Sequence, residues 1–304
     1  MWLVELDEID KTLWQELYGN CRASYQYLAN KLGLTANGVR KRVERLIESG
    51  VIIEWSISLQ PAMIDSQYAF IEVMTDGTHD SDELFKQFYD KPEIYVILPL
   101  TSGDYVLHAF YNGSEGLLNL SSFLRQLNGV KETQIHPTIT SIGNKIELSN
   151  LQRRVLKFLV KDPRMSISQI AQESGLTSRR VRKIVDQLQE SNAFIFDFTW
   201  NPNAGDSMAF LARIEYDPKK GTSDDIENRI RADYNLEYFY SHVSAIDTVM
   251  FSVFMIQHLF DMEQIANSLK KYPGVKTVKP LIYYSATVAT PLTVSHLEEL
   301  LSEN

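Results

Sequence analysis

Two short segments of the chain gather arginine and lysine side chains at a spacing suited to nucleic acid. Guanidinium and ammonium groups neutralise backbone phosphates, and Arg, Lys and Asn also hydrogen-bond to base edges in the major groove. The candidate contact residues are Asn37, Arg40, Lys41, Arg42 and Arg45 in the first segment and Ser178, Arg179, Arg180, Arg182 and Lys183 in the second. A charge run is usually only a solvated helix face. Here the basic face occurs twice, which favours double-stranded DNA as a partner.

These basic segments stand out against an acidic background. The chain has 304 residues, and its 30 Lys and Arg against 39 Asp and Glu give a net charge of −9. A global positive field for nucleic acid or an anionic membrane is therefore absent, so DNA contacts must come from local patches. The longest apolar stretches, such as 249–256, fall well short of the roughly 20 residues of a membrane helix. We expect a cytoplasmic protein without a membrane partner.

Residues that could carry other chemistry are scarce. The single cysteine, Cys21, excludes an internal disulfide and a paired-cysteine metal site. The motifs of phosphate-binding loops, dinucleotide folds, serine hydrolases and zinc proteases do not occur. We therefore expect no catalytic residue, no metal site and no cofactor, and the prediction is that the protein is not an enzyme.

The basic segments belong to an internal repeat. Residues 28–35 (LANKLGLT) recur as 170–177 (IAQESGLT), and Val39-Arg40-Lys41 returns as Val181-Arg182-Lys183 at the same offset. The repeat continues more faintly at slightly different offsets. These fainter matches are Ala69-Phe70 with Ala209-Phe210, Gly103-Asp104 with Ile246-Asp247, and Gly129-Val130-Lys131 with Gly274-Val275-Lys276. The chain is thus predicted to be a tandem duplication.

Each half begins with three short predicted helices. In the first half they cover 8–18, 24–33 and 35–49, with Ser24 and Thr35 as N-caps and Gly33 as the stop signal between the last two. Two helices joined by such a tight turn are typical of a helix-turn-helix, whose second helix enters the major groove. Ser24 and its counterpart Ser166, each starting the second helix, are predicted to bind phosphate.

The rest of each half alternates strands and helices. In the first half the pattern predicts strand 68–74, helix 81–90, strands 94–100 and 104–111, helix 115–127 and a strand from 129 to about 139. The second half repeats the order over 208–216, 222–233, 236–243, 247–256, 258–271 and 274–284. This βαββαβ order is typical of a ferredoxin-like domain.

The predicted fold class is α+β, as a tandem repeat of a helix-turn-helix domain and a ferredoxin-like domain. Predicted boundaries are 1–60, 61–140, 141–202 and 203–304, with Pro61 and Pro202 marking the crossovers. A last helix, capped at Ser295, is assigned to the fourth domain.

At this point the residues carry a family resemblance. Leu6 to Asp10, the Gly33-Leu34-Thr35 turn, Val39 with Arg42-Val43, Leu46 and the segment 48–52 resemble the Lrp/AsnC (leucine-responsive, feast/famine) regulators. The Gly103-Asp104-Tyr105 turn and the segment 127–130 resemble that family's sensing domain. The resemblance implies a transcriptional regulator that self-associates through its βαββαβ domains, as a dimer or higher. It also implies an amino acid or other small metabolite as effector. The implied contact residues are Thr101, Ser102, Gly103 and Asp104.

The chain departs from the family pattern in its second half. Ile184 replaces Arg42, Asn192 replaces Gly50, and 244–247 replaces the glycine turn. We therefore expect the second sensing domain to be structural or to sense something else. Because a family chain has one such pair of domains, a tandem chain could form its own pseudo-dimer. The unlike third helices predict an asymmetric operator.

Two other functions remain open. Siroheme decarboxylases resemble the same family and act on a tetrapyrrole with nearby histidines. The ferredoxin-like domains here contain His108, His136, His242 and His258. The other alternative is a sensing module that does not bind DNA, which an occluded basic face on the third helices would favour.

Overall fold

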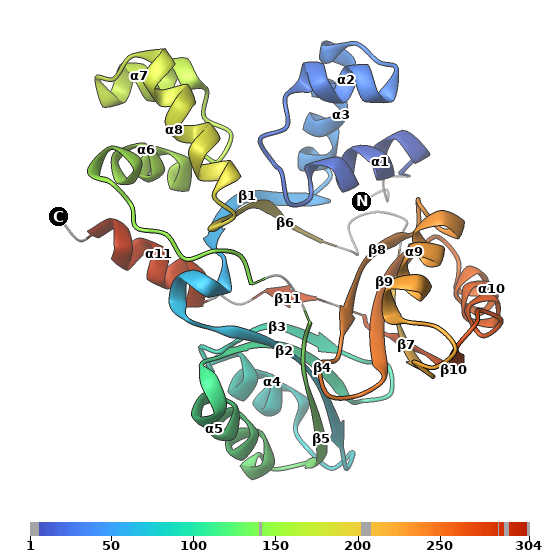
Figure 1. Ribbon diagram of the computed structural model, residues 1–304. Helices are drawn as coiled ribbons and strands as arrows, with labels where there is room; N and C mark the ends of the chain where they lie inside the picture. The colour runs from blue at the N-terminus through green and yellow to red at the C-terminus, as the bar shows by residue number, and fades with distance from the viewer. Residues whose placement is uncertain (1–5, 140–141, 202–207, 285, 289–291, 303–304) are drawn as a thin grey trace. The chain divides into compact units, whose positions relative to one another are not determined.

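Both halves of the repeat contribute to each of two structural units (Figure 1). The computed structural model describes residues 6–139, 142–201, 208–284, 286–288 and 292–302. The helix unit comprises Asp7–Ser66, Ile142–Asn201 and Thr290–Asn304, and the sheet unit comprises Met1–Leu6, Gln67–Ser141 and Pro202–Ala289. The predicted crossover at Pro202 lies outside the described residues. Every described helix is too short or too polar to span a lipid bilayer.

The helix unit contains two sets of three helices, each followed by a strand. The elements of the first set are α1 (Glu8–Leu17), α2 (Tyr25–Leu32), α3 (Ala36–Glu48), β1 (Ile52–Leu59) and the 3-10 turn η1 (Pro61–Ile64). Those of the second set are α6 (Asn150–Lys161), α7 (Ile167–Ser174), α8 (Ser178–Glu190) and β6 (Phe194–Trp200). Asn192 has a φ of 52°, so it keeps the left-handed conformation that Gly50 adopts in the first set.

The two sets are joined through their strands. β1 and β6 form an antiparallel pair in which Trp55 lies opposite Phe198 and Ser56 lies opposite Asp197. Trp55 and Asp197 occupy the same position of the repeat, as do Ser56 and Phe198. This exchange is what a two-fold axis through the middle of the strand pair produces. The helix-turn-helix sets of one chain therefore pair as two subunits would.

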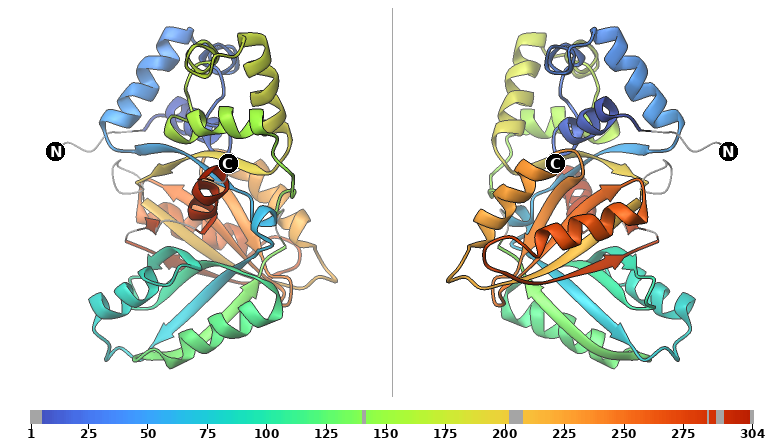
Figure 2. Two further views of the ribbon diagram at one scale, coloured as in Figure 1. Left: turned by 90° about the vertical axis from the view of Figure 1, so that its left-hand side faces the viewer. Right: turned by 90° about the vertical axis from the view of Figure 1, so that its right-hand side faces the viewer.

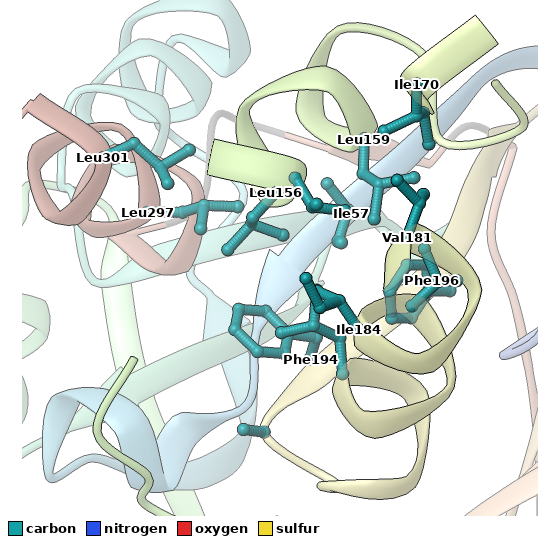
Figure 3. Packing of buried hydrophobic residues seen from close by; sticks show 14 of the residues in the cluster. Ile57, Leu156, Leu159, Ile170, Val181, Ile184, Phe194, Phe196, Leu297 and Leu301 are labelled. Carbon is teal, nitrogen blue, oxygen red and sulfur yellow. The ribbon is translucent and has the colours of Figure 1, made fainter. Parts of the chain in front are cut away.

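The C-terminal helix α11 (Leu292–Ser302) packs in the helix unit, where it contacts β1, α6 and η1. Leu297 and Leu301 are buried in the core formed with Leu156 and Phe194 (Figure 3). The sequence had placed this helix with the second ferredoxin-like domain, which is wrong. Ser295 is also not its N-cap, because the helix begins three residues earlier and its buried side begins at Thr293.

The sheet unit contains two ferredoxin-like domains, which confirms the predicted fold class. Elements of the first are β2 (Gln67–Thr75), α4 (Ser81–Tyr89), β3 (Ile94–Pro99), β4 (Tyr105–Tyr111), α5 (Gly113–Gln126) and β5 (Val130–Pro137). Elements of the second are β7 (Met208–Tyr216), α9 (Ser223–Asp233), β8 (Tyr238–Val243), β9 (Val249–Ile256), α10 (Leu259–Leu269) and β10 (Val275–Ile282). The strand order is β3-β4-β2-β5 in the first sheet and β8-β9-β7-β10 in the second, with the short strand β11 (Thr287–Val288) beside β3.

Each sheet has a helix-covered face and an opposite face. Helices α4 and α5 cover the first sheet, and α9 and α10 cover the second (Figure 2). On the opposite faces the rings of Phe70 and Phe251 stack with centroids 4.0 Å apart, so the two sheets of one chain meet face to face.

The sheets also correct the predicted alignment of the two halves. Ala69 on β2 and Phe210 on β7 both point into the cores under the helices, so Ala69 is the counterpart of Phe210. The match of Ala69 to Ala209 that the sequence suggested is therefore wrong by one position. That match would turn every side chain of one strand to the opposite face, because the side-chain period of a strand is two.

Candidate nucleic-acid interface

The helix-turn-helix geometry follows from local capping signals. Ser24 accepts a hydrogen bond from the Tyr27 amide, and Thr35 accepts one from the Gly38 amide. Between these two caps Gly33 takes a φ of 66°, a left-handed conformation that ends α2 without a steric cost. The second set repeats this pattern with a φ of 67° at Gly175.

Helix α8 presents a basic face to solvent. Its buried side is formed by Val181, Ile184, Val185 and Leu188. On the other side are Ser178 and the predicted contact residues Arg179, Arg180, Arg182 and Lys183, all exposed. Among the residues that the structure describes, none of these four cations forms an ion pair. Their charges are thus available to phosphates and base edges.

Helix α3 presents a smaller basic face. Asn37, Arg40 and Lys41 are exposed. The Arg40 guanidinium lies 5.8 Å from the centre of the Tyr25 ring, a cation–π contact that orients the side chain while keeping it accessible. Among the described residues, α3 therefore has two exposed cations that form no ion pair, Arg40 and Lys41, against four on α8.

The other two predicted contact residues of α3 are engaged inside their own domain. Arg42 donates to Asp10 Oδ1 at 2.8 Å and also to Asp7, and Arg45 donates to Asp10 Oδ2. Asp10 is fully buried, so these contacts neutralise a charge that would otherwise be costly. In the second half, the positions of Asp10, Arg42 and Arg45 are occupied by Gln152, Ile184 and Gln187. These three side chains are neutral, so the second half has no buried charge at this place that needs a partner.

Ser24 and Ser166 are both exposed, and their hydroxyl groups serve as helix caps. Ser166 accepts from the Gln169 amide at 3.2 Å and donates to the Gln169 side chain at 2.7 Å. The hydroxyl of Ser166 is therefore occupied within the chain. Among the described residues, the Ser24 hydroxyl forms one hydrogen bond, which it accepts from the Tyr27 amide at 3.1 Å.

Sequence reasoning missed two arginines that join the helix-turn-helix sets. Arg22 donates to the carbonyl oxygens of Pro163 and Met165, and Arg164 donates to those of Cys21 and Ala23. Positions 21–23 of the first set correspond to positions 163–165 of the second, so each loop clasps the other in the same way. We call Arg22 and Arg164 the arginine clasp. The repeat alone would have matched these arginines, but only the fold shows that they face each other.

The predicted effector turn at Thr101, Ser102, Gly103 and Asp104 joins β3 to β4. Asp104 accepts hydrogen bonds from the Thr75 amide at 3.0 Å and the Ser102 hydroxyl at 2.9 Å. The carboxylate thereby stabilises the turn, while Thr101, Ser102 and Gly103 are exposed. The corresponding turn of the second half is one residue longer. In the first half the Leu100 amide donates to the carbonyl oxygen of Asp104, four residues on, whereas in the second half the Ser244 amide donates to that of Val249, five residues on.

A cavity of about 480 Å³ lies beside this longer turn of the second half, in the sheet unit. It is polar, and its lining includes His136 and the charged side chains of Arg213, Glu215, Asp247 and Lys276. His136 lies 3.3 Å from both Glu72 and Asp247. The site therefore offers both signs of charge to a small ligand.

Two of the four predicted histidines come together between the sheets. His108 Nδ1 hydrogen-bonds with the Tyr68 hydroxyl, and the rings of His108 and His242 are 5.2 Å apart. Burial lowers the pKa of His108 well below its usual range, helped by His242, and lowers that of His242 to about 4. Both rings are therefore neutral at pH 7. His136 on β5 also faces the second sheet, with its ring 5.2 Å from that of Phe251, but it is not part of this pair. His258 precedes α10 at the surface.

Comparison with known proteins agrees with this geometry. A family model described as winged helix-turn-helix DNA-binding matches residues 6–53 and 148–192. The transcriptional regulator LrpA of Bacillus subtilis is 33% identical over 127 residues, which are 40% of this chain and 90% of that protein. The regulator FL11 of Pyrococcus horikoshii is 31% identical over 133 residues, 43% of this chain and 87% of that protein.

A solved structure matches the tandem arrangement as a whole. The siroheme decarboxylase NirDL aligns with a TM-score of 0.54 over 97% of this chain and 99% of that one, at 13% identity. At this identity the likeness concerns the fold alone. The regulators match nearly their whole length to about half of this chain at up to 33% identity, and the helix-turn-helix model matches both halves. The chain therefore belongs to the Lrp/AsnC family.

Proposed function

We propose that the protein is a sequence-specific DNA-binding transcriptional regulator. The observation that carries the proposal is the pairing, within one unit, of two helix-turn-helix sets whose third helices expose basic side chains. Exposure of both basic faces argues against a sensing module that no longer binds DNA. The relatives with the same domain, LrpA and FL11, are named as transcriptional regulators.

In this proposal α3 and α8 enter successive major grooves, held together by the β1–β6 pair and the arginine clasp. The DNA contacts assigned to α8 are Ser178, Arg179, Arg180, Arg182 and Lys183, and those assigned to α3 are Asn37, Arg40 and Lys41. The exposed hydroxyl of Ser24 and the first-turn amides after Ser24 and Ser166 bind phosphate. Arg42 and Arg45 act instead by holding α3 against α1. Because the two helices differ, the two half-sites differ.

The effector is proposed to be an amino acid or a similar small metabolite. The turn of Thr101 to Asp104 remains the candidate site in the first sensing domain, since three of its four residues are exposed. The polar cavity beside Asp247 supports a second candidate, because its mixed charges suit a zwitterion. A ligand would regulate DNA binding only by favouring one arrangement of the helices or one assembly state. Self-association beyond the single chain is proposed to use the ferredoxin-like domains.

The test is binding to genomic DNA fragments at two salt concentrations. The variant Arg180→Ala/Arg182→Ala should bind more weakly and show a shallower salt dependence, by about 0.9 in log–log slope for each phosphate that is no longer neutralised. The matched control Lys219→Ala/Lys220→Ala also removes two exposed cations, but from the sheet unit, and should bind as the wild type does. Equal losses in both variants, or no binding by the wild type at low salt, would contradict the proposal.

A second candidate function is an enzyme of the siroheme decarboxylase kind. It is favoured by the two neutral histidines between the sheets, since His108 Nε2 and His242 Nδ1 are buried without a hydrogen-bond partner among the described residues. Titration with an iron tetrapyrrole, followed by its absorption spectrum, tests this candidate. A spectral change that disappears in His108→Phe would support it, and an unchanged spectrum would exclude it.

A further inference from the structure

Glu72 on β2 and Arg213 on β7 occupy the same position of the duplicated sheet. The two strands have equal length, and Glu72 and Arg213 are each the sixth residue of their strand. On the neighbouring edge strand Glu72 lies opposite Gln134, and Arg213 lies opposite Lys279. Gln134 and Lys279 are in turn each the fifth residue of β5 and β10. The positions of Glu72 and Arg213 in the two ladders are therefore equivalent.

These two equivalent residues contact each other. The Arg213 Nε atom donates to Glu72 Oε1 at 3.0 Å, and the side chains are only 16% and 14% exposed. Residues that are related by a two-fold rotation and also touch must lie at the rotation axis. Glu72 and Arg213 therefore lie at the pseudo-two-fold axis of the sheet unit.

Reciprocal crossings of the chain support this axis. The amide of Thr101, after β3, donates to the carbonyl oxygen of Ile282 at the end of β10. The amide of Ala245, after β8, donates to that of Pro137 at the end of β5. Each half thus reaches over to the other in the same way, as the two subunits of a symmetric dimer do.

A charged residue at such an axis discriminates between partners. If two first domains from different chains paired in this way, Glu72 would face Glu72, and in a pair of second domains Arg213 would face Arg213. Like charges that are brought together in a largely buried contact repel each other strongly. The unlike pair instead forms an ion pair, in the way that complementary charges select the partners of coiled coils.

The carboxyl group of Glu72 is ionised at neutral pH. Burial by itself would raise its pKa, but the hydrogen bond with His136 and the charge of Arg213 outweigh burial and lower the pKa below its usual range. The charge needed for the discrimination is thus present.

The apolar contacts around the axis do not discriminate in the same way. Phe70 stacks on Phe251, and the equivalent residues on the other side of the axis are Leu211 and Val106, both fully buried. Pairing of like domains would keep apolar side chains against one another at these positions. The charged pair at the axis is therefore the part of the interface that favours unlike domains.

We propose that Glu72 and Arg213 form a partner-selecting pair, which makes the first ferredoxin-like domain bind the second domain rather than another copy of itself. Because both domains belong to one chain, the effective concentration favours closure of the chain on itself. Each closed chain then has one α3 and one α8. This inference goes beyond the proposed function and does not depend on it.

The test uses full-length charge variants with neutral controls. Glu72→Arg places Arg against Arg213, and Arg213→Glu places Glu against Glu72, whereas Glu72→Gln and Arg213→Gln only remove the ion pair. Each charge-reversed variant should unfold at a lower temperature than its neutral control. The larger drop is expected for Arg213→Glu, because Glu215 already lies 2.5 Å from Arg213 and would become a third negative charge.

Co-expression of tagged and untagged chains then tests partner choice. Tagged Glu72→Arg should retain untagged Arg213→Glu at least about tenfold better than it retains untagged Glu72→Arg, because only the mixture restores unlike charges at both axes. The co-purified mixture should also unfold at a higher temperature than either variant alone, even if each alone folds poorly. Equal unfolding temperatures for charge-reversed and neutral variants, or equal retention of both untagged chains, would overturn the proposal.

Discussion

The buried carboxylate of Asp10 makes a quantitative prediction about the first helix-turn-helix set. Replacing Arg42 by isoleucine, the residue found at this position in the second half, removes the bond to Asp10 Oδ1 at 2.8 Å. Removing one partner of a buried ion pair costs roughly 3–5 kcal/mol. Because Arg42 is 25% exposed and Arg45 remains in place, we expect a loss of about 2 kcal/mol in the free energy of unfolding.

The assay is urea unfolding of the full chain, followed by circular dichroism. The matched control is the triple variant Asp10→Gln/Arg42→Ile/Arg45→Gln, which copies the neutral set of the second half. It should recover most of the lost stability, because no buried charge is left without a partner. The salt dependence of DNA binding should stay unchanged in Arg42→Ile under conditions where the protein is folded. A stable Arg42→Ile variant with a shallower salt dependence would refute the assignment and return Arg42 to the DNA contacts.

Three further predictions concern the joint between the two helix-turn-helix sets. Burial raises the pKa of Asp197 to about 6, so the folded state holds this proton to higher pH than the unfolded state, and stability should fall as pH rises from about 4 to 6. Asp197→Asn should flatten that slope in urea titrations, and an unchanged slope would disprove the assignment. Burial likewise raises the pKa of Cys21 to about 12, so the thiol should resist alkylation at pH 8 until urea unfolds the protein, whereas rapid labelling of the native protein would contradict its burial. Arg22→Ala/Arg164→Ala removes all four hydrogen bonds of the clasp. It should weaken binding to a full operator by about tenfold while leaving an isolated half-site unaffected, and equal affinities for the full operator in variant and wild type would argue against a positioning role.

Most of the fold could be predicted from local signals. The caps Ser24 and Thr35, the left-handed Gly33 and the apolar spacing of each helix act within a few residues, and they predicted the helix-turn-helix sets correctly. The order of strand-like and helical segments likewise predicted both βαββαβ domains. Local sequence identity gave the wrong alignment of the two halves at one place. The match of Ala69-Phe70 to Ala209-Phe210 is identical in sequence, but it is off by one position and would place the side chains on the wrong face of the sheet.

The candidate site could be predicted only in part. The basic faces of α3 and α8 follow from helical periodicity, because the apolar stripe fixes which side of the helix is exposed. The engagement of Arg42 and Arg45 could not be predicted, since it depends on Asp10, which lies two helices earlier in the chain. The same limit applies to the arginine clasp and to the histidine pair between the sheets.

The sequence by itself determined the duplication, the type of each domain and the positions of the exposed basic residues, because these depend on contacts between near neighbours in the chain. Only the tertiary structure decided that β1 pairs with β6, that α11 packs in the helix unit, and that Glu72 meets Arg213. The residues that form these contacts are separated by about half of the chain or more. Which apolar and charged surfaces meet is decided by burial and charge in the folded protein, and periodicity along the chain carries no information about it.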